Sequence, residues 1–394
     1  MTIDQLNRRP FDTSFFTEDN LNGYFSLMTS LGCPYACIFC ATGGGKGHRA
    51  MNPENVIEAA QRYQEHLERI KAQGAVIHDK AWQVVFSDDD FLRDSKRAIR
   101  MLELWRKAGL KLKIKTFQST LQSFLVSEAG RGRAVNNDFM DSIESFKDIF
   151  SHDFKIQIGT DGLIDQEIRR LNKGPYNERL IEDVMAGLDK RGIMNEHFLI
   201  LTNADTTLED LMRMLLKACI FEIRYPHTFF YPNYAIRPHI GSSAVNKLIE
   251  TSREALIEGG KHRDDRPDFK EYDLYDEACY IVPENIPSEV FYDLKMFFAA
   301  RFSFNQSAMH LMLECLNRLM RRIYDKTDLF SEPLLRGSSI FKEEGDLSEL
   351  AELFNRVMPA YRSTFAGAFM ALQLLDRRLT TLRLEDSKAV DSSL

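Results

Sequence analysis

Three closely spaced cysteines are the residues of this 394-residue chain with the clearest chemical potential. Cys33, Cys37 and Cys40 lie in the stretch GCPYACIFC, with the spacing C-x3-C-x2-C, directly after a short apolar run. Cysteine thiolates are the usual ligands of iron–sulfur clusters. Three of them can hold three irons of a cubane and leave the fourth iron open to a small molecule. The spacing therefore predicts a [4Fe-4S] cluster with one open iron.

Two other uses of these cysteines have to be weighed against the cluster. A zinc site could use His48 as its fourth ligand, but zinc fingers usually pair two short Cys/His knuckles and no second knuckle is present. A disulfide framework is disfavoured because the chain has only six cysteines and its first 20 residues are polar, without a secretory signal. Free thiols without such a signal favour the reducing cytoplasm.

The cysteine motif resembles that of the radical SAM superfamily. These enzymes use a [4Fe-4S] cluster to split S-adenosyl-L-methionine (SAM) into methionine and a 5′-deoxyadenosyl radical. Phe39, just before the third cysteine, matches the family position whose aromatic ring packs against the adenine of SAM. The resemblance implies an enzyme with two cofactors, the cluster and SAM, and an electron-donating reductase such as flavodoxin or ferredoxin as its partner.

An alternation of strand and helix patterns must position this loop. Such alternation predicts parallel strands joined by right-handed crossovers. Six strand–helix units fit a partial (β/α)6 TIM-type barrel of the radical SAM type, although a complete eight-fold barrel or a doubly wound sheet fits the pattern too. The predicted strands are residues 24–29, 81–87, 111–117, 154–159, 196–202 and 227–236, and the predicted helices span 52–73, 94–107, 137–150 and 178–191, with a further one opening at a capping box at 206–209.

The chain changes character after about residue 240. Residues 1–240 are predicted to form the radical SAM core barrel that carries the cluster. Residues 241–394 contain a charged linker and helical patterns, and they are predicted to form a mainly helical region that covers the substrate pocket. Of the other cysteines, Cys219 and Cys315 fall on apolar helical stripes and are interpreted as core residues, so a second cluster is not expected.

Polar residues follow each predicted strand, as expected where parallel α/β enzymes place their sites. Ser87, Asp88 and Asp89 follow the second strand and match the family's Gly-Gly-Glu position, whose backbone holds the methionine amino group. A solvated turn, a helix cap or a metal site is the alternative for these aspartates.

The fourth and fifth strands add further candidates from the resemblance. Asp161 matches a carboxylate that accepts hydrogen bonds from the ribose hydroxyls. Arg170 or Lys173 is the candidate partner of the SAM carboxylate, with an exposed helical charge as the alternative. Thr202, after the fifth strand, is predicted to offer backbone groups to the adenine.

Composition narrows the class of substrate. The net charge is −7 and the pI is near 5.8, which argues against long nucleic acids, and no run of 18 apolar residues predicts a membrane span. Only 32 residues precede Cys33, so a conventional cobalamin-dependent methylase with an N-terminal cobalamin domain is not expected. A small-molecule or natural-product substrate is therefore favoured, which places the chain in biosynthesis. An RNA or peptide modifier and a non-catalytic iron–sulfur sensor or electron-transfer protein stay open.

Overall fold

A computed structural model of the chain divides into two compact units. The first comprises Met1–Ile200 with Tyr225–Tyr280, and the second comprises Leu201–Arg224 with Ile281–Leu394. Each unit is considered by itself. The structure describes residues 16, 21–41, 47–128, 132–233, 242–243 and 286. Most of the region 241–394 lies outside these residues, so the predicted domain boundary at 240 stays a prediction.

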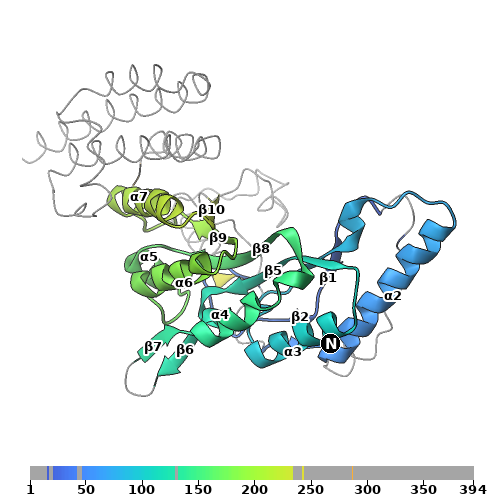
Figure 1. Cartoon of the computed structure of the whole chain (residues 1–394). Helices are drawn as coiled ribbons and strands as arrows, with labels where there is room; N and C mark the ends of the chain where they lie inside the picture. The colour runs from blue at the N-terminus through green and yellow to red at the C-terminus, as the bar shows by residue number, and fades with distance from the viewer. Residues whose placement is uncertain are drawn as a thin grey trace, which may run out of the picture. The chain divides into compact units, whose positions relative to one another are not determined.

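Six parallel strands form the central sheet of the first unit, and their order in the sheet is their order along the chain (Figure 1). Every neighbouring pair is parallel, which is the arrangement that right-handed crossovers produce. In the described part of the chain, the first and last strands each pair with a single neighbour, so the sheet is open as in a partial barrel. The strands are β1 (Phe25–Leu27), β4 (Gln83–Phe86), β5 (Lys113–Thr120), β8 (Phe150–Asp161), β9 (Asn195–Ile200) and β10 (Thr228–Asn233).

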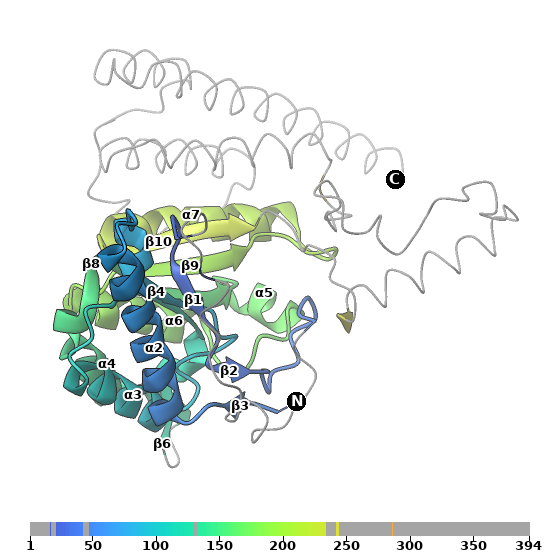
Figure 2. The same ribbon diagram turned by 90° about the vertical axis from the view of Figure 1, so that its right-hand side faces the viewer.

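Helices connect these strands, and four helices of the first unit pack beside one another in chain order (Figures 1 and 2). Asp94, Asn136 and Asn177 cap three of them by accepting a hydrogen bond from a backbone N–H three residues further on, at 3.0 to 3.1 Å. The helices of the first unit are α2 (Pro53–Ala72), α3 (Ser95–Lys107), α4 (Asn137–Glu144), α5 (Asp165–Arg170) and α6 (Glu178–Lys190), and the second unit contains α7 (Leu208–Arg224).

The predicted α/β class with a six-stranded parallel sheet is confirmed, while some element boundaries are not. The predicted helix 137–150 ends at Glu144, because Phe150 already belongs to β8 and stacks on Phe154 with ring centroids 3.9 Å apart. The capping box lies one residue later than predicted. Thr207 accepts from the backbone N–H of Asp210 at 3.2 Å, and the Asp210 carboxylate accepts from the Thr207 N–H at 3.3 Å.

Short elements that the sequence pattern did not predict lie between the strands of the central sheet. Two antiparallel pairs are among them, β2 (Ser30–Leu31) with β3 (Arg49–Ala50), and β6 (Leu125–Glu128) with β7 (Gly132–Val135). The 3-10 turns are η2 (Asp79–Trp82) directly before β4, η3 (Leu121–Phe124) directly after β5 and η4 (Lys147–Ile149) directly before β8.

Cys219 on α7 is fully buried, as predicted for a core residue. Cys279 and Cys315 lie outside the described residues.

Within the part of the chain that the structure describes, no helix has the length and apolar character needed to cross a membrane.

Candidate active site

The three cysteines lie in the loop that connects β2 to β3. All three are free thiols; Cys33 and Cys37 are buried and Cys40 is half-buried. Burial raises the pKa of the Cys33 thiol, and it raises the pKa of Cys37 to about 11. The Cys40 backbone N–H donates to the Cys37 carbonyl at 3.2 Å, so a tight turn joins the second and third cysteines. Buried thiols ionise when a cationic metal takes them as ligands.

This donor set fits a cluster better than a single metal ion. Among the described residues, no three His, Cys, Asp or Glu side chains converge closely enough to ligate one ion. The zinc alternative with His48 therefore lacks the converging ligands it needs. Cysteines that each bind a different iron of a cubane are spread around the cluster, and three free thiols in one loop, two of them buried, fit that requirement.

A segment from the end of α5 holds the middle of the cysteine loop. The backbone N–H of Ile38 donates to the Leu171 carbonyl at 3.2 Å, and the side-chain amide of Asn172 donates to the Ala36 carbonyl at 2.8 Å. Asn172 has a φ of 48°, a left-handed conformation that asparagine tolerates better than most residues. The carboxyl end of α5 therefore fixes the backbone between the cysteines.

A buried ion pair stands beside two of the cysteines. Lys173 and Asp161 are both buried and their Nζ and Oδ2 atoms form an ion pair. Burial alone lowers the pKa of Lys173, but the Asp161 carboxylate outweighs it, so the pKa lies above its usual value. The same cation acts on the thiols of Cys33 and Cys37, and it lies 5.5 Å from the centre of the Phe39 ring. The exposed-charge alternative for Lys173 is wrong.

The aspartates after β4 tie that strand to the cysteine loop. Asp88 is fully buried and accepts from the Thr29 N–H at 3.1 Å, from the Thr29 hydroxyl at 2.9 Å and from the Ser30 hydroxyl. Asp89 accepts from the Gly32 N–H at 3.0 Å, one residue before Cys33. Asp88 is therefore no solvated turn residue. Its side chain and that of Asp89 set the position at which the cysteine loop begins.

The third aspartate, which was not among the predicted site residues, ties β4 to β5. Asp90 is fully buried and accepts hydroxyl hydrogen bonds from Ser119 at 2.6 Å, Thr120 at 2.9 Å and Ser123 at 2.8 Å. In the sequence, Asp90 could be recognised only as the third residue of an acidic run, and nothing showed that it lies between two strand ends.

Arg97 and Gln122 are two further positioning residues that the sequence analysis missed. Arg97 donates to the Thr29 carbonyl at 3.1 Å and to the Met51 carbonyl at 2.9 Å, so it joins the two ends of the segment that carries the cysteines. A positive charge in the first turn of a helix is unfavourable because of the helix dipole. The position of Arg97 in the first turn of α3 was therefore a sign that its side chain contacts another part of the protein. Gln122 donates to the Lys173 carbonyl at 2.8 Å and carried no such signal.

The structure brings most of the predicted site residues to one edge of the sheet. Phe39, Asp161 and Lys173 gather around the cysteine loop, and Asp88 and Asp89 hold the start of that loop. The remaining candidates have other partners or lie elsewhere. The Ser87 hydroxyl lies 2.9 Å from the Ser26 hydroxyl, and Arg170 is paired with Glu167. Thr202 is buried in the second unit, so its predicted contact with SAM stays a prediction.

Comparison with solved structures identifies the fold. The cobalamin-dependent S-adenosylmethionine radical enzyme OxsB with aqua-cobalamin matches with a TM-score of 0.57 and 13% identity, over 92% of this chain and 55% of that chain. OxsB with aqua-cobalamin and S-adenosylmethionine matches with a TM-score of 0.57 and 12% identity, over 95% and 56%. This chain thus spans about half the length of OxsB. No family model and no curated protein matches the sequence. The fold of this chain is that of the radical SAM enzymes.

Proposed function

We propose that this chain is a radical SAM enzyme in which Cys33, Cys37 and Cys40 hold a [4Fe-4S] cluster and SAM binds its open iron. The observation that carries the proposal is a loop of three free thiols, two of them buried, beside the Lys173–Asp161 ion pair and Phe39. When bound and reduced, the cluster supplies one electron that splits SAM, and the resulting 5′-deoxyadenosyl radical takes a hydrogen atom from the substrate.

The residues around the loop have distinct tasks in this proposal. Phe39 packs against the adenine, and Asp161 accepts hydrogen bonds from the ribose. Lys173 supplies a fixed positive charge that offsets the negative charge of the thiolates and attracts the SAM carboxylate. Backbone groups of the Ser87–Asp89 turn receive the methionine amino group. Support for this assignment comes from the ion pair and from the position of the turn at the start of the loop.

The proposed substrate is a small molecule or natural product, and the proposed location is the cytoplasm. The net charge of −7 supports a substrate other than a long nucleic acid. A reductase such as flavodoxin or ferredoxin completes the proposal as the electron source.

Anaerobic reconstitution with iron and sulfide tests the proposal. The protein receives dithionite and SAM, and 5′-deoxyadenosine is measured. We expect the wild type and Cys219→Ala to form it, and Cys37→Ala to form none and to hold less iron. Cys219 is the matched control because it is also buried but lies on α7. A cluster without SAM binding or cleavage would replace the proposal by the sensor or electron-transfer function.

A second arm of this assay adds hydroxocobalamin. OxsB is described as cobalamin-dependent. A higher yield of 5′-deoxyadenosine with the additive would indicate that this chain uses cobalamin as well, and an equal yield would indicate that it does not.

A further inference from the structure

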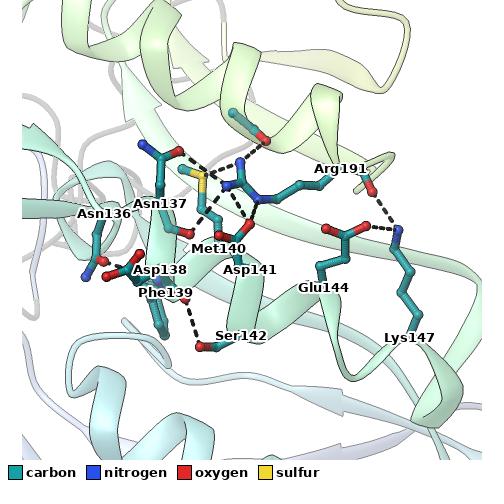
Figure 3. A network of polar contacts seen from close by, with 11 residues as sticks. Asn136, Asn137, Asp138, Phe139, Met140, Asp141, Ser142, Glu144, Lys147 and Arg191 are labelled. Carbon is teal, nitrogen blue, oxygen red and sulfur yellow. Dashed lines mark hydrogen bonds and ion pairs between the residues drawn. The ribbon is translucent and has the colours of Figure 1, made fainter.

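Helices pack against one face of the central sheet. The ring of Phe86 on β4 meets that of Trp105 on α3, with ring centroids 5.8 Å apart. The helices α4 and α6 belong to the same layer, and Arg191 ties them together: its guanidinium donates to the Asp141 carboxylate and to the Gly187 carbonyl, both at 2.7 Å (Figure 3). This layer occupies one face of the sheet, which leaves the opposite face for a ligand.

The opposite face carries polar side chains in the middle of the sheet. Phe117 is the register partner of Phe86, and side chains alternate between the two faces of a strand, so Gln118 points to the opposite face. The register partner of Gln118 on β8 is Gln157, and the partner of Gln157 on β9 is Glu196. These three side chains, one from each of three neighbouring strands, form a polar row.

Hydrogen bonds give the polar row a fixed direction. Lys155 donates to one carboxylate oxygen of Glu196 at 2.7 Å, and the Gln157 amide donates to the other at 2.7 Å. A carboxylate only accepts hydrogen bonds, so Gln157 turns its N–H to Glu196 and its carbonyl to Gln118. The Gln118 amide donates to that carbonyl at 3.3 Å, which leaves its side-chain oxygen as the acceptor at the end of the row. Among the described residues, no group donates to this oxygen.

The polar row adjoins the ion pair beside the cysteine loop. Gly159 follows Gln157 by two residues on the same face of β8 and has no side chain. A Cβ at Gly159 would lie 3.2 Å from the Lys173 Nζ and 3.8 Å from the Asp161 Oδ2. The ion pair therefore lies over Gly159, about 7 Å further along the strand than Gln157. A substrate on the polar row is placed next to the groups that are proposed to hold SAM.

The charges around the polar row favour an uncharged substrate. The Lys155–Glu196 pair and the Lys173–Asp161 pair each carry no net charge. A charged substrate would lose part of its hydration here and would meet only charges that already have a partner.

Apolar side chains lie at both ends of the polar row. Phe229 on β10 is the register partner of Glu196 and is 44% exposed. Met28 directly follows Leu27, the register partner of Phe86, so it lies on the same face as the row, and it is 50% exposed. The inner face of a partial barrel thus combines one oriented acceptor with apolar surface.

We propose that Gln118 determines substrate specificity: its side-chain oxygen accepts a hydrogen bond from a hydroxyl or amino group of an uncharged small molecule. This inference rests on the proposed function and names the substrate class for the same site. Gln157, Glu196 and Lys155 are positioning residues, because they act through the orientation of the Gln118 amide. A molecule of the same shape that lacks the donor leaves this oxygen unpaired and binds more weakly.

Phenol and anisole are the probes that test this selection, because they share a ring and only phenol has a hydroxyl donor. Their dissociation constants are measured by ligand-detected NMR on the reconstituted enzyme, with and without SAM and without reductant. Bound SAM keeps phenol from the open iron of the cluster.

Two variants and one control are compared with the wild type. Gln118→Met removes the amide oxygen at similar side-chain length. Glu196→Gln replaces a pure acceptor by an amide that also donates, so the row is no longer oriented. The control is Gln64→Met on α2, because Gln64 is also a half-buried glutamine that donates to a carboxylate, that of Glu68 at 3.5 Å.

We expect the wild type and Gln64→Met to bind phenol about fivefold more tightly than anisole, the factor that one net hydrogen bond gives. Gln118→Met should lose this preference and bind anisole as the wild type does, which shows that the variant is folded. Glu196→Gln should lose most of the preference, although Glu196 lies two strands away from Gln118.

A wild type without preference for phenol overturns the proposal, as does a preference that survives in Gln118→Met. A preference that survives in Glu196→Gln overturns the role of the row in orienting Gln118. Formation of 5′-deoxyadenosine with dithionite is measured separately on the same preparations. Its absence overturns the proposed function, while the comparison of phenol with anisole still decides the role of Gln118.

Discussion

The Lys173–Asp161 pair gives the sharpest prediction about the energetics of the site. Both side chains are about 8% exposed, and the pair lies at the end of β8 beside the cysteine loop. Lys173→Met keeps much of the side-chain length and removes the charge, which leaves the Asp161 carboxylate buried without its cation. Breaking one partner of a buried ion pair costs about 3–5 kcal/mol. We therefore expect Lys173→Met to lower the free energy of unfolding by about that amount.

The partner substitution separates the ion pair from simple packing. Asp161 has a φ of 61°, and asparagine tolerates this left-handed conformation, so Asp161→Asn removes the charge without adding backbone strain. In the double variant Lys173→Met/Asp161→Asn no unpaired charge remains. We expect the double variant to recover at least half of the stability lost in Lys173→Met.

Urea unfolding of the cluster-free protein, followed by fluorescence, measures these free energies. The four proteins of the cycle give the coupling energy between positions 161 and 173. The reasoning is refuted if Lys173→Met costs less than about 1 kcal/mol, or if the double variant is no more stable than that single variant. After reconstitution, both variants that lack Lys173 should also bind SAM more weakly than the wild type.

Three further predictions concern the loop, a buried histidine and a buried aspartate. Gly32 has a φ of 87°, and a Cβ there would lie 2.3 Å from the Gly47 carbonyl oxygen, so Gly32→Ala should retain less iron after reconstitution, whereas iron retention equal to the wild type would contradict this. Burial lowers the pKa of His197 to about 3; the unfolded value is near 6.5, so its contribution to stability is complete above pH 6.5 and is lost as the pH falls, by about 1.4 kcal/mol per unit. Unfolding measured at successive pH values should show this slope in the wild type and a smaller one in His197→Asn; equal slopes would refute it. Asp90→Ala leaves three hydroxyl donors without their acceptor and should cost about 1–3 kcal/mol per donor left unpaired, checked by urea unfolding, and an unchanged midpoint would show that water replaces the carboxylate.

Much of the fold was predictable because its signals are local. Asp94, Asn136 and Asn177 act on backbone N–H groups three residues away, so the beginnings of their helices could be predicted from short stretches. Strands of buried apolar residues alternate with those helices, and that alternation led to the six-stranded parallel sheet. The early end of α4 was missed, because the apolar residues up to Phe150 fit a helical pattern as well as the start of a strand.

The cysteine spacing, the parallel α/β class and the edge of the sheet where the polar residues gather all followed from the order of the amino acids. Which side chains meet at that edge became defined only in the folded chain. Asn172 bonds to Ala36 across 136 residues, and Arg97 bonds to Thr29 across 68, because the order of the strands in the sheet brings these segments together. Helix caps and hydrophobic periodicity act over about four residues, so contacts of this range become defined only when the whole sheet has formed.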